Sequence, residues 1–555
     1  MKKIIKFGVL VDSFELKKWQ TDCLKLLSSH EQIACGLVII KKQTKPKAKI
    51  LSWLSFDKYR YFLYLLYQKL MNTPKSWYPE NLKELGLSYK IIECDLIGAG
   101  VSSELSREDI CNIKSFELDF LIRFGFGILK GDILNAAKHG IWSFHHDDEE
   151  KYRGRPPCFW PIYFKNNLSG VILQKLNETL DGGVILEKGI YKTLAHSYSK
   201  NIDNIYQKSI YFPLIVCQRL LLNAIDIDSL KPVKNLGSIY KIPTNIQMLF
   251  FIYRVTIGYL NYLYKAIFRT QFWHIGIIKK PIWHVLDNDT LNIEWLPAYK
   301  KNRFLADPFG LIINGNLNIF AEEYKYSLAK GEIVSFDYLE YLENQNSKKI
   351  FDEIYHLSYP FVFKYNNSIY CIPESSRSNQ VTLYKIDKTL LKWEKYKLID
   401  NISVLDPTIF QYSNKWWLMC SDRKYGSSSL SLWFADDLMG PWSEHHLNPI
   451  RNDVRYSRSG GTIFEYNNKL YRPSQNNECS YGGELNLFEI VNLTESSYEE
   501  VYIRAIRPDN KSEFPSGIHT LSSVGDYTLV DGRRDIFNIS SLWLLIKNKL
   551  KRWIG

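Results

Sequence analysis

The sequence predicts an α/β domain followed by an all-β domain, with a helical connector between them. A chain of 555 residues is too long for one ordinary hydrophobic core. Its first part alternates strand-like apolar runs with helical segments, which is the pattern of a parallel sheet. From about residue 273 it changes to short strands separated by Gly, Asn and Asp turns, with an internal repeat. We therefore expect an α/β domain at 1–200, a connector at 201–272, a β-propeller at 273–540 and a basic amphipathic tail at 541–555.

Apolar runs predict the strands of the α/β sheet, at residues 5–12, 36–40, 91–94 and 118–122. Ser106 and Asp109 form a capping pattern that opens a helix, and a further helix is expected at about 131–138. The next strand ends at His145. We expect this residue at the carboxyl ends of the strands, where open α/β sheets bind their ligands. No G-x-G-x-x-G motif follows the first strand, so a dinucleotide site is not predicted.

Three short motifs follow one another around the end of this strand. They are Ser143 and His145, then the loop Arg153-Gly154 with two prolines close behind it, then the turn Asp181-Gly182-Gly183. In this order they resemble the active site of the formyltransferases that use 10-formyltetrahydrofolate, the family of the methionyl-tRNA and sugar N-formyltransferases. The family pattern is Asn-x-His, an Arg-Gly loop and Asp-x-Gly. Ser143 stands here in the place of the Asn.

The resemblance implies a Rossmann-like fold with 10-formyltetrahydrofolate as the formyl donor. Carried over by position, His145 is the catalytic acid/base group, Asp181 is its partner, and Ser143 takes the place of the oxyanion donor. Folate contacts are expected from Asp181 and from the glycine loop Phe124, Gly125, Phe126 and Gly127. Contacts with the acceptor are expected from His146, Asp147 and Arg153.

The serine at position 143 changes what the motif offers. A serine hydroxyl is shorter than an amide, and loss of one oxyanion donor lowers a rate by about 10²–10³. His146 is a candidate substitute donor. The acidic run 147–150 has two interpretations, a solvated loop or a site that attracts the ammonium of an amino sugar. A hydrolase triad of Ser143, His145 and Asp181 is not expected, because no nucleophile elbow is present.

The all-β part repeats a short motif. The second positions of the repeat are Asp307, Tyr359, Asp406, Gly460 and Ser516, spaced 52, 47, 54 and 56 residues apart. Periods near 50 with several strands per unit are typical of propellers, and five units predict five blades. Residues 271–278 are expected to supply the strand that closes the ring.

These blades resemble the amino-terminal propeller of the plant glucosamine inositolphosphorylceramide transferases, which is related in architecture to the five-bladed glycoside hydrolases. The matching segments are 306–309, 356–361, 372–375 and 415–418. The resemblance implies a fold and a glycan ligand. We expect Asp307, Glu374 and Asp406 to bind it at the axis, where the inner strands converge. Hydrolysis needs two suitably placed carboxylates, so binding, hydrolysis and a purely structural role all stay open.

The net charge and the cysteine pattern indicate which ligands the protein favours and which cellular compartment it is expected in. The net charge of +12 favours anionic partners, here a nucleotide- or lipid-linked sugar, and nucleic acid is not expected. The 9 cysteines are odd in number and none lies in a CxxC pair, which argues against a disulfide framework or a zinc site and fits a reducing cytosol. The basic, apolar start is predicted to be a strand, not a signal peptide.

Two segments have the character of membrane-surface helices, the basic amphipathic tail 541–555 and the aromatic stretch 51–71. Each either contacts the inner membrane face or docks on the protein's own domains. Residues 248–268 are largely apolar, but Arg254 and Lys265 interrupt them, so we expect a buried or interfacial helix.

Together these features predict a cytoplasmic N-formyltransferase that modifies an amino sugar in surface polysaccharide biosynthesis. The propeller is expected in the place of the small β-domain that methionyl-tRNA enzymes append, so a sugar is favoured over tRNA as acceptor. Two alternatives remain. One is a glycan-binding or scaffold protein with an impaired formyltransferase domain, and the other is a propeller glycosidase.

Overall fold

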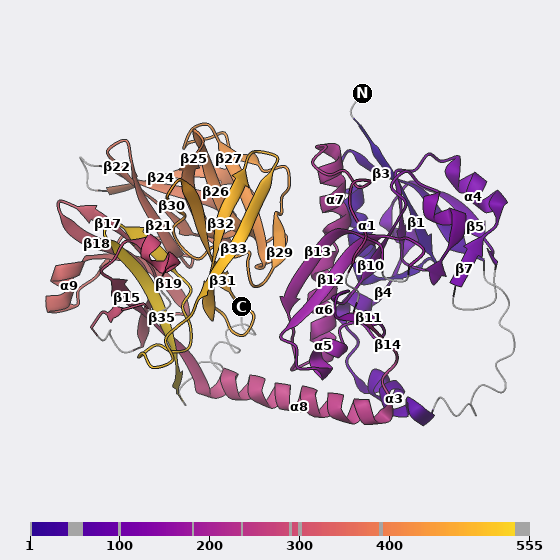
Figure 1. Cartoon of the computed structure of the whole chain (residues 1–555), viewed down its shortest axis with the longest axis horizontal. Coiled ribbons are helices and arrows are strands. Elements are labelled where there is room, and N and C mark those ends of the chain that lie inside the picture. Colours follow the sequence, from indigo (N-terminus) through magenta and orange to yellow (C-terminus); the bar gives the residue numbers. More distant parts are fainter. Residues whose placement is uncertain are drawn as a thin grey trace. The chain divides into compact units, whose positions relative to one another are not determined.

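The computed structural model describes residues 3–42, 59–97, 102–179, 182–234, 237–287, 291–297, 302–387 and 392–538. The chain divides into two compact units, Met1–Asn261 and Tyr262–Gly555. Figure 1 colours them along the sequence, from indigo in the first unit to yellow in the second.

The first unit is built on a largely parallel sheet (Figure 1). Its strands are β1 (Ile5–Val11), β3 (Ile33–Lys41), β5 (Lys90–Cys94), β8 (Phe120–Arg123), β10 (Ile141–His145), β12 (Leu168–Lys175) and β13 (Val184–Lys192). They pair in the order β13–β12–β10–β8–β1–β3–β5. The pairs from β10 to β5 are parallel, whereas β12 and β13 run antiparallel. The predicted α/β class and its expected strands are confirmed, because runs such as Val9, Leu10 and Val11 are fully buried in the central strand.

The helices of the first unit are α1 (Lys18–Ser28), α3 (Phe62–Leu70), α4 (Arg107–Lys114), α5 (Trp160–Tyr163), α6 (Tyr198–Ser209) and α7 (Phe212–Leu221), with the 3₁₀ turns η2 (Lys75–Trp77), η3 (Leu82–Leu85) and η4 (Gly131–Asn135). Helix α1 packs against β3, α6 against β12 and α7 against β13. Ser106 caps α4 as predicted, since its hydroxyl accepts the N–H of Asp109 at 3.0 Å. The helix expected at 131–138 is only the short turn η4, because glycine, Asp132 and Asn135 are weak helix formers.

Short strands complete the first unit. They are β2 (Glu15–Lys17) paired with β4 (Pro79–Asn81), β11 (Tyr152–Gly154) paired with β14 (Ser238–Tyr240), and a small sheet of β6 (Leu96–Ile97), β7 (Ser102–Leu105) and β9 (Ile128–Leu129).

The segment expected as a connector has two parts of different character. Helices α6 and α7 bury Ile202, Ile205 and Val216 within the first unit. The long helix α8 (Asn245–Phe268) follows, and only Met248 and Phe251 of it are buried. None of the helices in the described ranges combines the length and the hydropathy needed to cross a bilayer.

The second unit is propeller-like and made of antiparallel sheets. One four-stranded sheet is β17 (Arg303–Ile313), β18 (Asn316–Lys325), β19 (Lys330–Asp337) and β20 (Lys348–Lys349). The next is β21 (Ser358–Tyr365), β22 (Ser368–Glu374), β23 (Gln380–Asp387) and β24 (Lys392–Asp400). A third is β30 (Phe464–Tyr466), β31 (Lys469–Asn476), β32 (Glu484–Leu493) and β33 (Tyr498–Ile506). Helix α9 (Tyr338–Asn344) and the turns η5 (Ile282–Leu286) and η6 (Ser376–Ser378) lie between strands.

A fourth sheet joins the two ends of this unit. It contains β15 (Arg269–Ile278), β16 (Glu294–Trp295), β34 (Leu521–Val524) and β35 (Tyr527–Phe537). Strands β15 and β35 pair over their whole length, from Arg269 opposite Phe537 to Ile278 opposite Thr528. The prediction that residues 271–278 close the ring is therefore confirmed.

The prediction of five separate blades is corrected to four. The remaining strands, β25 (Val404–Tyr412), β26 (Lys415–Asp422) and β27 (Ser429–Ala435), form an antiparallel meander. Their outer edge is not one strand, because β27 pairs partly with β28 (Ser443–Glu444) and partly with β29 (Arg451–Asp453). Pro441 and Pro449 lie on either side of β28. Since proline lacks the N–H that a ladder needs, these residues interrupt a regular fourth strand.

Candidate functional site

Ser143 lies on β10 and is almost completely buried. Its hydroxyl accepts two hydrogen bonds from Arg123, from Nε at 3.1 Å and from Nη2 at 2.8 Å. Arg123 ends the neighbouring strand β8 and also donates to the carbonyl of Gly127. Sequence reasoning missed Arg123, since nothing in the strand pattern shows which side chain meets Ser143. Where the formyltransferase pattern has the amide of Asn, this protein therefore has a serine hydroxyl that is hydrogen-bonded to the guanidinium of Arg123.

His145 ends the same strand and is half-buried. Its Nε2 lies 2.8 Å from the carbonyl oxygen of Tyr152. A carbonyl only accepts, so Nε2 carries a proton and donates it to Tyr152. The backbone thus fixes both the tautomer and the orientation of the imidazole. Its catalytic role stays a prediction.

His146 lies in the interior of the first unit, which differs from the acceptor-facing position we expected. Its ring stacks on Tyr206, with centroids 3.6 Å apart, and meets the edge of Trp19 at 4.9 Å. Its Nε2 is 3.4 Å from the hydroxyl of Ser209. Burial lowers the pKa of His146 well below its usual value, so the ring is neutral in this aromatic cluster.

The acidic run that begins at Asp147 is not a solvated loop. Asp147, Asp148 and Glu149 are buried. Lys188 holds Asp148 at 3.2 Å and Glu149 at 2.7 Å. Asp147 accepts the N–H of Cys158 at 2.9 Å, and burial raises the pKa of its carboxyl well above the usual range. These three acids are buried, and Lys188 or the backbone contacts each of them, so they do not form the exposed acidic surface that the ammonium-attracting interpretation needs.

The Arg153-Gly154 loop is the short strand β11. At Gly154, φ is +92°, and a Cβ there would lie 2.2 Å from the carbonyl oxygen of Tyr240. Glycine is therefore required for β11 to pair with β14. Arg153 precedes it and is half-buried. Asp181 lies outside the described residues, whereas Gly183 donates its N–H to the side chain of Gln174 at 3.1 Å.

The expected folate loop, residues 124–127, is fastened to the end of β1. Asp12 accepts the N–H of Phe126 at 2.8 Å, and a Cβ on Gly125 would lie 2.6 Å from the Asp12 nitrogen. Phe126 has a left-handed φ of +68° and is buried, and Gly127 follows with +62°. Phe124 instead lines a cavity of about 380 Å³ together with Asp12, Lys17, Gln20 and Trp77.

The repeat in the propeller sequence corresponds to a β-bulge that recurs in successive sheets. Asp307, Tyr359 and Asp406 have left-handed φ values of +51°, +46° and +48°. Each sits in a bulge of its strand. Beside these bulges, Ala306 pairs with Glu322 and Ser358 pairs with Glu374. Two adjacent blades thus place a glutamate at equivalent positions. The repeat in the sequence predicted the equivalence of the bulged positions, and of these two glutamates it pointed to Glu374 as a ligand-binding residue.

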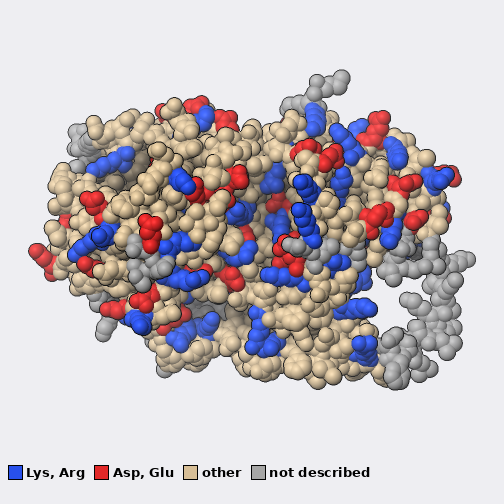
Figure 2. All heavy atoms as spheres, in the orientation of Figure 1, with Lys and Arg blue, Asp and Glu red and all other residues tan. Residues whose placement is uncertain are grey.

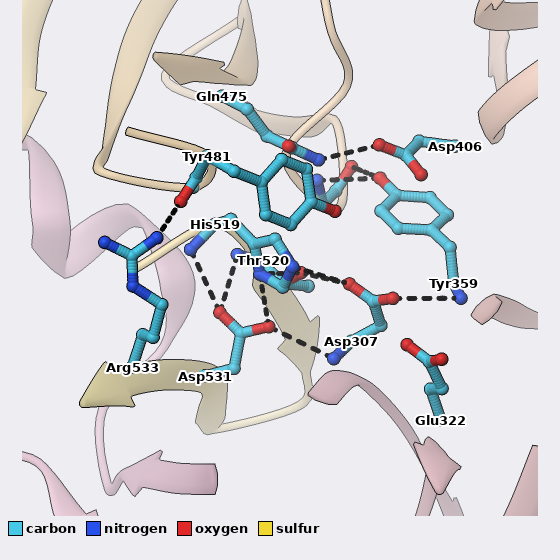
Figure 3. Close-up of polar contacts among 12 residues, drawn as sticks. Asp307, Glu322, Tyr359, Asp406, Gln475, Tyr481, His519, Thr520, Asp531 and Arg533 are labelled. Carbon is cyan, nitrogen blue, oxygen red and sulfur yellow. Dashed lines mark hydrogen bonds and ion pairs between the residues drawn. The ribbon is translucent and has the colours of Figure 1, made fainter. Parts of the chain in front are cut away.

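The carboxyl groups beside the first two bulges line a cavity of about 460 Å³, and Figure 3 shows several residues of this region in close-up. Its walls include Asp307, Glu322, Glu374, Arg458 and His519, with the aromatic residues Trp273, Tyr324, Tyr326 and Tyr481. Asp307 and Glu374 were expected in such a site. His519 and Trp273 were not, because they come from the far ends of the unit and meet only through ring closure. Their rings stack with centroids 3.9 Å apart.

Asp307 belongs to a closed hydrogen-bonded group (Figure 3). Its Oδ2 accepts the N–H of Tyr359 at 3.2 Å, and its Oδ1 accepts the hydroxyl of Thr520 at 3.0 Å. His519 bridges two carboxylates, with Nε2 3.5 Å from Asp307 and Nδ1 2.6 Å from Asp531. Burial raises the pKa of Asp307 to about 6. Asp307, His519 and Asp531 are the described group with metal-ligand chemistry, but these ligand atoms already satisfy one another and Thr520.

Asp406 lies behind the cavity wall rather than on it. Arg458 donates to it from Nε at 2.5 Å and from Nη2 at 3.2 Å, and Gln475 donates at 2.7 Å. Burial would raise the pKa of Asp406, but Arg458 outweighs it and keeps the carboxylate charged. The N–H of Asp406 reaches Glu374 at 3.4 Å. Asp406 therefore holds Arg458 in place, and Asp307 and Glu374 face the cavity.

The chain is similar to two different groups of known proteins, the plant glucosamine inositolphosphorylceramide transferases and the methionyl-tRNA formyltransferases. Residues 294–514 match the family described as glucosamine inositolphosphorylceramide transferase 1, N-terminal. The chain is 37% identical over 211 residues to glucosamine inositolphosphorylceramide transferase 1 of Oryza sativa subsp. japonica, which covers 37% of this chain and 28% of that protein. It thus spans little more than a quarter of such a relative.

The chain is also similar to formyltransferases in part. It is 35% identical over 83 residues to the methionyl-tRNA formyltransferase of Prochlorococcus marinus strain AS9601, which covers 15% of this chain and 25% of that enzyme. A solved sugar N-formyltransferase from a Shewanella species is 11% identical with a TM-score of 0.27, over 45% of this chain and 87% of that one. Such a score assigns no fold. The sequence comparisons therefore associate one part of the chain with formyltransferases and residues 294–514 with the N-terminal region of the plant transferases.

Proposed function

We propose that the first unit is an N-formyltransferase that moves a formyl group from 10-formyltetrahydrofolate to the amine of a nucleotide- or lipid-linked sugar. The observation that carries the proposal is the placement of His145. Its Nε2 donates to the Tyr152 carbonyl at the carboxyl end of β10, which fixes the orientation of the ring there. The partial similarity to methionyl-tRNA formyltransferases supports the same chemistry.

The residues near this site fit the donor. The cavity beside Phe124 combines two aromatic rings, Phe124 and Trp77, with the ammonium of Lys17 and the polar side chains of Asp12 and Gln20. Such a set suits a flat heterocycle and a carboxylate. When bound, the folate supplies the formyl carbon.

The chain's own groups have separate tasks in this proposal. His145 takes the proton that the attacking amine releases, at Nδ1. Arg123, held by Ser143 at 2.8 Å, brings a positive charge to the position where the family pattern has an amide donor. Asp181 remains the proposed partner of His145, as the motif implies.

The test is a turnover assay on the full chain with 10-formyltetrahydrofolate and a panel of nucleotide-linked amino sugars. Release of tetrahydrofolate and the mass of the formylated sugar are both measured. We expect His145→Gln to lower the rate by at least about 10²-fold, because the base is lost. The matched control is His139→Gln, which lies just before the same strand at its other end.

Two results would count against the proposal. If the protein neither bound folate nor turned it over, the transferase proposal would be wrong, and the alternative of a glycan-binding protein would be favoured. An unchanged rate in His145→Gln would remove the assigned base.

We propose in addition that the protein reaches lipid-linked acceptors through a peripheral membrane contact. Helix α3 exposes Phe62, Leu65, Leu66 and Leu70, and such an apolar face suits a bilayer surface. The tail 541–555 lies outside the described residues. Sedimentation with anionic vesicles should fall in Leu66→Asp combined with Leu70→Asp. The control Ile354→Asp, at an isolated exposed residue of the second unit, should bind as wild type does.

A further inference from the structure

The propeller cavity is rich in buried carboxyl groups. Its wall includes the carboxyl groups of Asp307, Glu322 and Glu374. Of the basic groups on this wall, Arg269 donates to the backbone carbonyl of Asp535 at 3.0 Å, and two others are paired with carboxylates. Arg458 is bound at 2.5 Å to Asp406, behind the wall, and His519 is bound at 2.6 Å to Asp531.

Glu322 is the clearest sign of a missing partner. Its side chain is more than nine-tenths buried, lines the cavity and, within the described residues, accepts no hydrogen bond (Figure 3). The nearest basic group is Nε2 of His356 at 3.7 Å. That imidazole is neutral near pH 7, because burial lowers its pKa to about 4. Burial raises the pKa of Glu322 well above its usual value, and the neighbouring carboxyl groups add to this shift. A ligand ammonium that donates to Glu322 would instead stabilise its carboxylate form.

Glu322 also has a structural counterpart. It stands opposite Ala306, beside the bulge at Asp307, and Glu374 stands opposite Ser358, beside the bulge at Tyr359. Two adjacent blades therefore direct the same kind of group toward one cavity. Glu374 is 3.7 Å from Nη2 of Arg458, whereas Glu322 has no such cation.

The remaining walls suit a sugar. Tyr324, Tyr326 and Tyr481 line the same cavity, and Tyr481 is 39% exposed. Aromatic rings with polar tips stack on pyranose faces and donate to hydroxyl groups. The volume, about 460 Å³, lies in the range of small-molecule pockets.

We propose that this cavity is a second saccharide site, which binds a sugar carrying a free protonated amine, with the ammonium donating to Glu322 and its neighbouring carboxylates. An ammonium has three donors and one positive charge, which matches the unpaired Glu322 beside Glu374. A neutral N-acylated sugar lacks that charge. The site therefore distinguishes a free amine from an acylated one, whether or not the first unit transfers formyl groups.

The experiment is calorimetric titration of the full chain, without folate, with three trisaccharides of matched size. They are the glucosamine trimer, the N-acetylglucosamine trimer and cellotriose. We expect the glucosamine trimer to bind at least about tenfold more tightly than the other two, since a charge-assisted hydrogen bond is about twice as strong as a neutral one.

Variants locate the binding site. Glu322→Gln should lower the affinity for the glucosamine trimer to that of cellotriose and leave thermal stability equal or higher, because it removes an unpaired buried carboxyl. Glu332→Gln is the control, since that residue pairs with Lys325 and Lys349 outside the cavity. His145→Gln should bind as wild type does, which separates this site from the proposed transferase site.

Three outcomes would overturn the proposal. They are equal affinity for all three sugars, unchanged affinity in Glu322→Gln, and binding of the trimer that requires added calcium. The last would assign the carboxylates to a metal ion instead.

Discussion

The buried acids of the two units differ in what surrounds them. In the first unit Lys188 holds Asp148 and Glu149, and Asp147 accepts the N–H of Cys158. In the second unit Glu322 lines a cavity without a donor. Sequence motifs point to the first unit as the reactive one, yet the buried carboxyl that faces a cavity without a hydrogen-bond donor is in the propeller. The difference shows that a motif and a buried polar group facing a cavity are independent indications of function.

Surface charge does not separate the units as clearly. On the face drawn in Figure 2, basic and acidic side chains both occur over most of the surface. The net charge of +12 is therefore a weaker guide to a ligand than the interior contacts are.

The largest effect is expected from the buried ion pair of the propeller. Arg458→Met leaves Asp406 buried without its cation, and breaking such a pair costs about 3–5 kcal/mol. Hydrogen exchange followed by mass spectrometry should show loss of protection in β25 and β31. The control Arg377→Met, at an exposed position, should change stability by less than about 0.5 kcal/mol. Protection equal to wild type in Arg458→Met would mean that Gln475 alone can stabilise Asp406.

The next effect tests the first unit. Gly154→Ala places a Cβ 2.2 Å from the Tyr240 carbonyl at a φ of +92°, so we expect a loss of about 2 kcal/mol. Exchange in β11 and β14 peptides measures it. Gly86→Ala has a similar φ of +67° but open space around it, and it should cost only about 1 kcal/mol. Equal losses in the two variants would show that backbone strain, not the approach to Tyr240, sets the requirement.

A smaller effect concerns the pair that replaces the family's amide. A double-mutant cycle of Ser143→Ala and Arg123→Met should give a coupling energy of about 1.5 kcal/mol, as for hydrogen bonds to charged groups. Urea unfolding of the four proteins gives the value. A coupling near zero would free Ser143 to act on a substrate instead.

The smallest effect is a difference in pH dependence. Burial lowers the pKa of His146, so its contribution to the first unit is present above its ordinary value of 6.5 and lost as pH falls below it. Burial alone would lower the pKa of His519 too, but Asp531 and Asp307 raise it above 6.5. Its contribution to the second unit is therefore present below 6.5 and lost as pH rises through the higher folded value.

Pulse proteolysis in urea between about pH 5 and pH 8, with products assigned to each unit, should show these opposite slopes. Subtracting the curves of His146→Phe and His519→Gln isolates each histidine. If the histidine contributions to stability changed with pH in the same direction in both units, the predicted opposite pH dependence would be wrong.

Much of this architecture could be predicted from the sequence, where local pattern decides structure. Apolar runs predicted the positions of β1, β3, β5 and β8. The repeat positions Asp307, Tyr359 and Asp406 each lie in a bulge of their own strand, with the same left-handed backbone conformation. The blade number was wrong, because pairing of the β27 edge depends on prolines outside the repeat. The contacts of Ser143 and the meeting of Trp273 with His519 could not be predicted, since they join strands that only the complete fold brings together.

The pairing of β15 with β35 has a consequence for synthesis. Arg269 and Phe537 are neighbours in the sheet although they lie at opposite ends of the second unit. During translation, β15 leaves the ribosome long before its partner exists, and its unpaired edge is open to wrong pairing meanwhile. Because such a distant contact closes late, the propeller should close only once β35 has been synthesised, and truncation before β35 should leave an aggregation-prone open sheet.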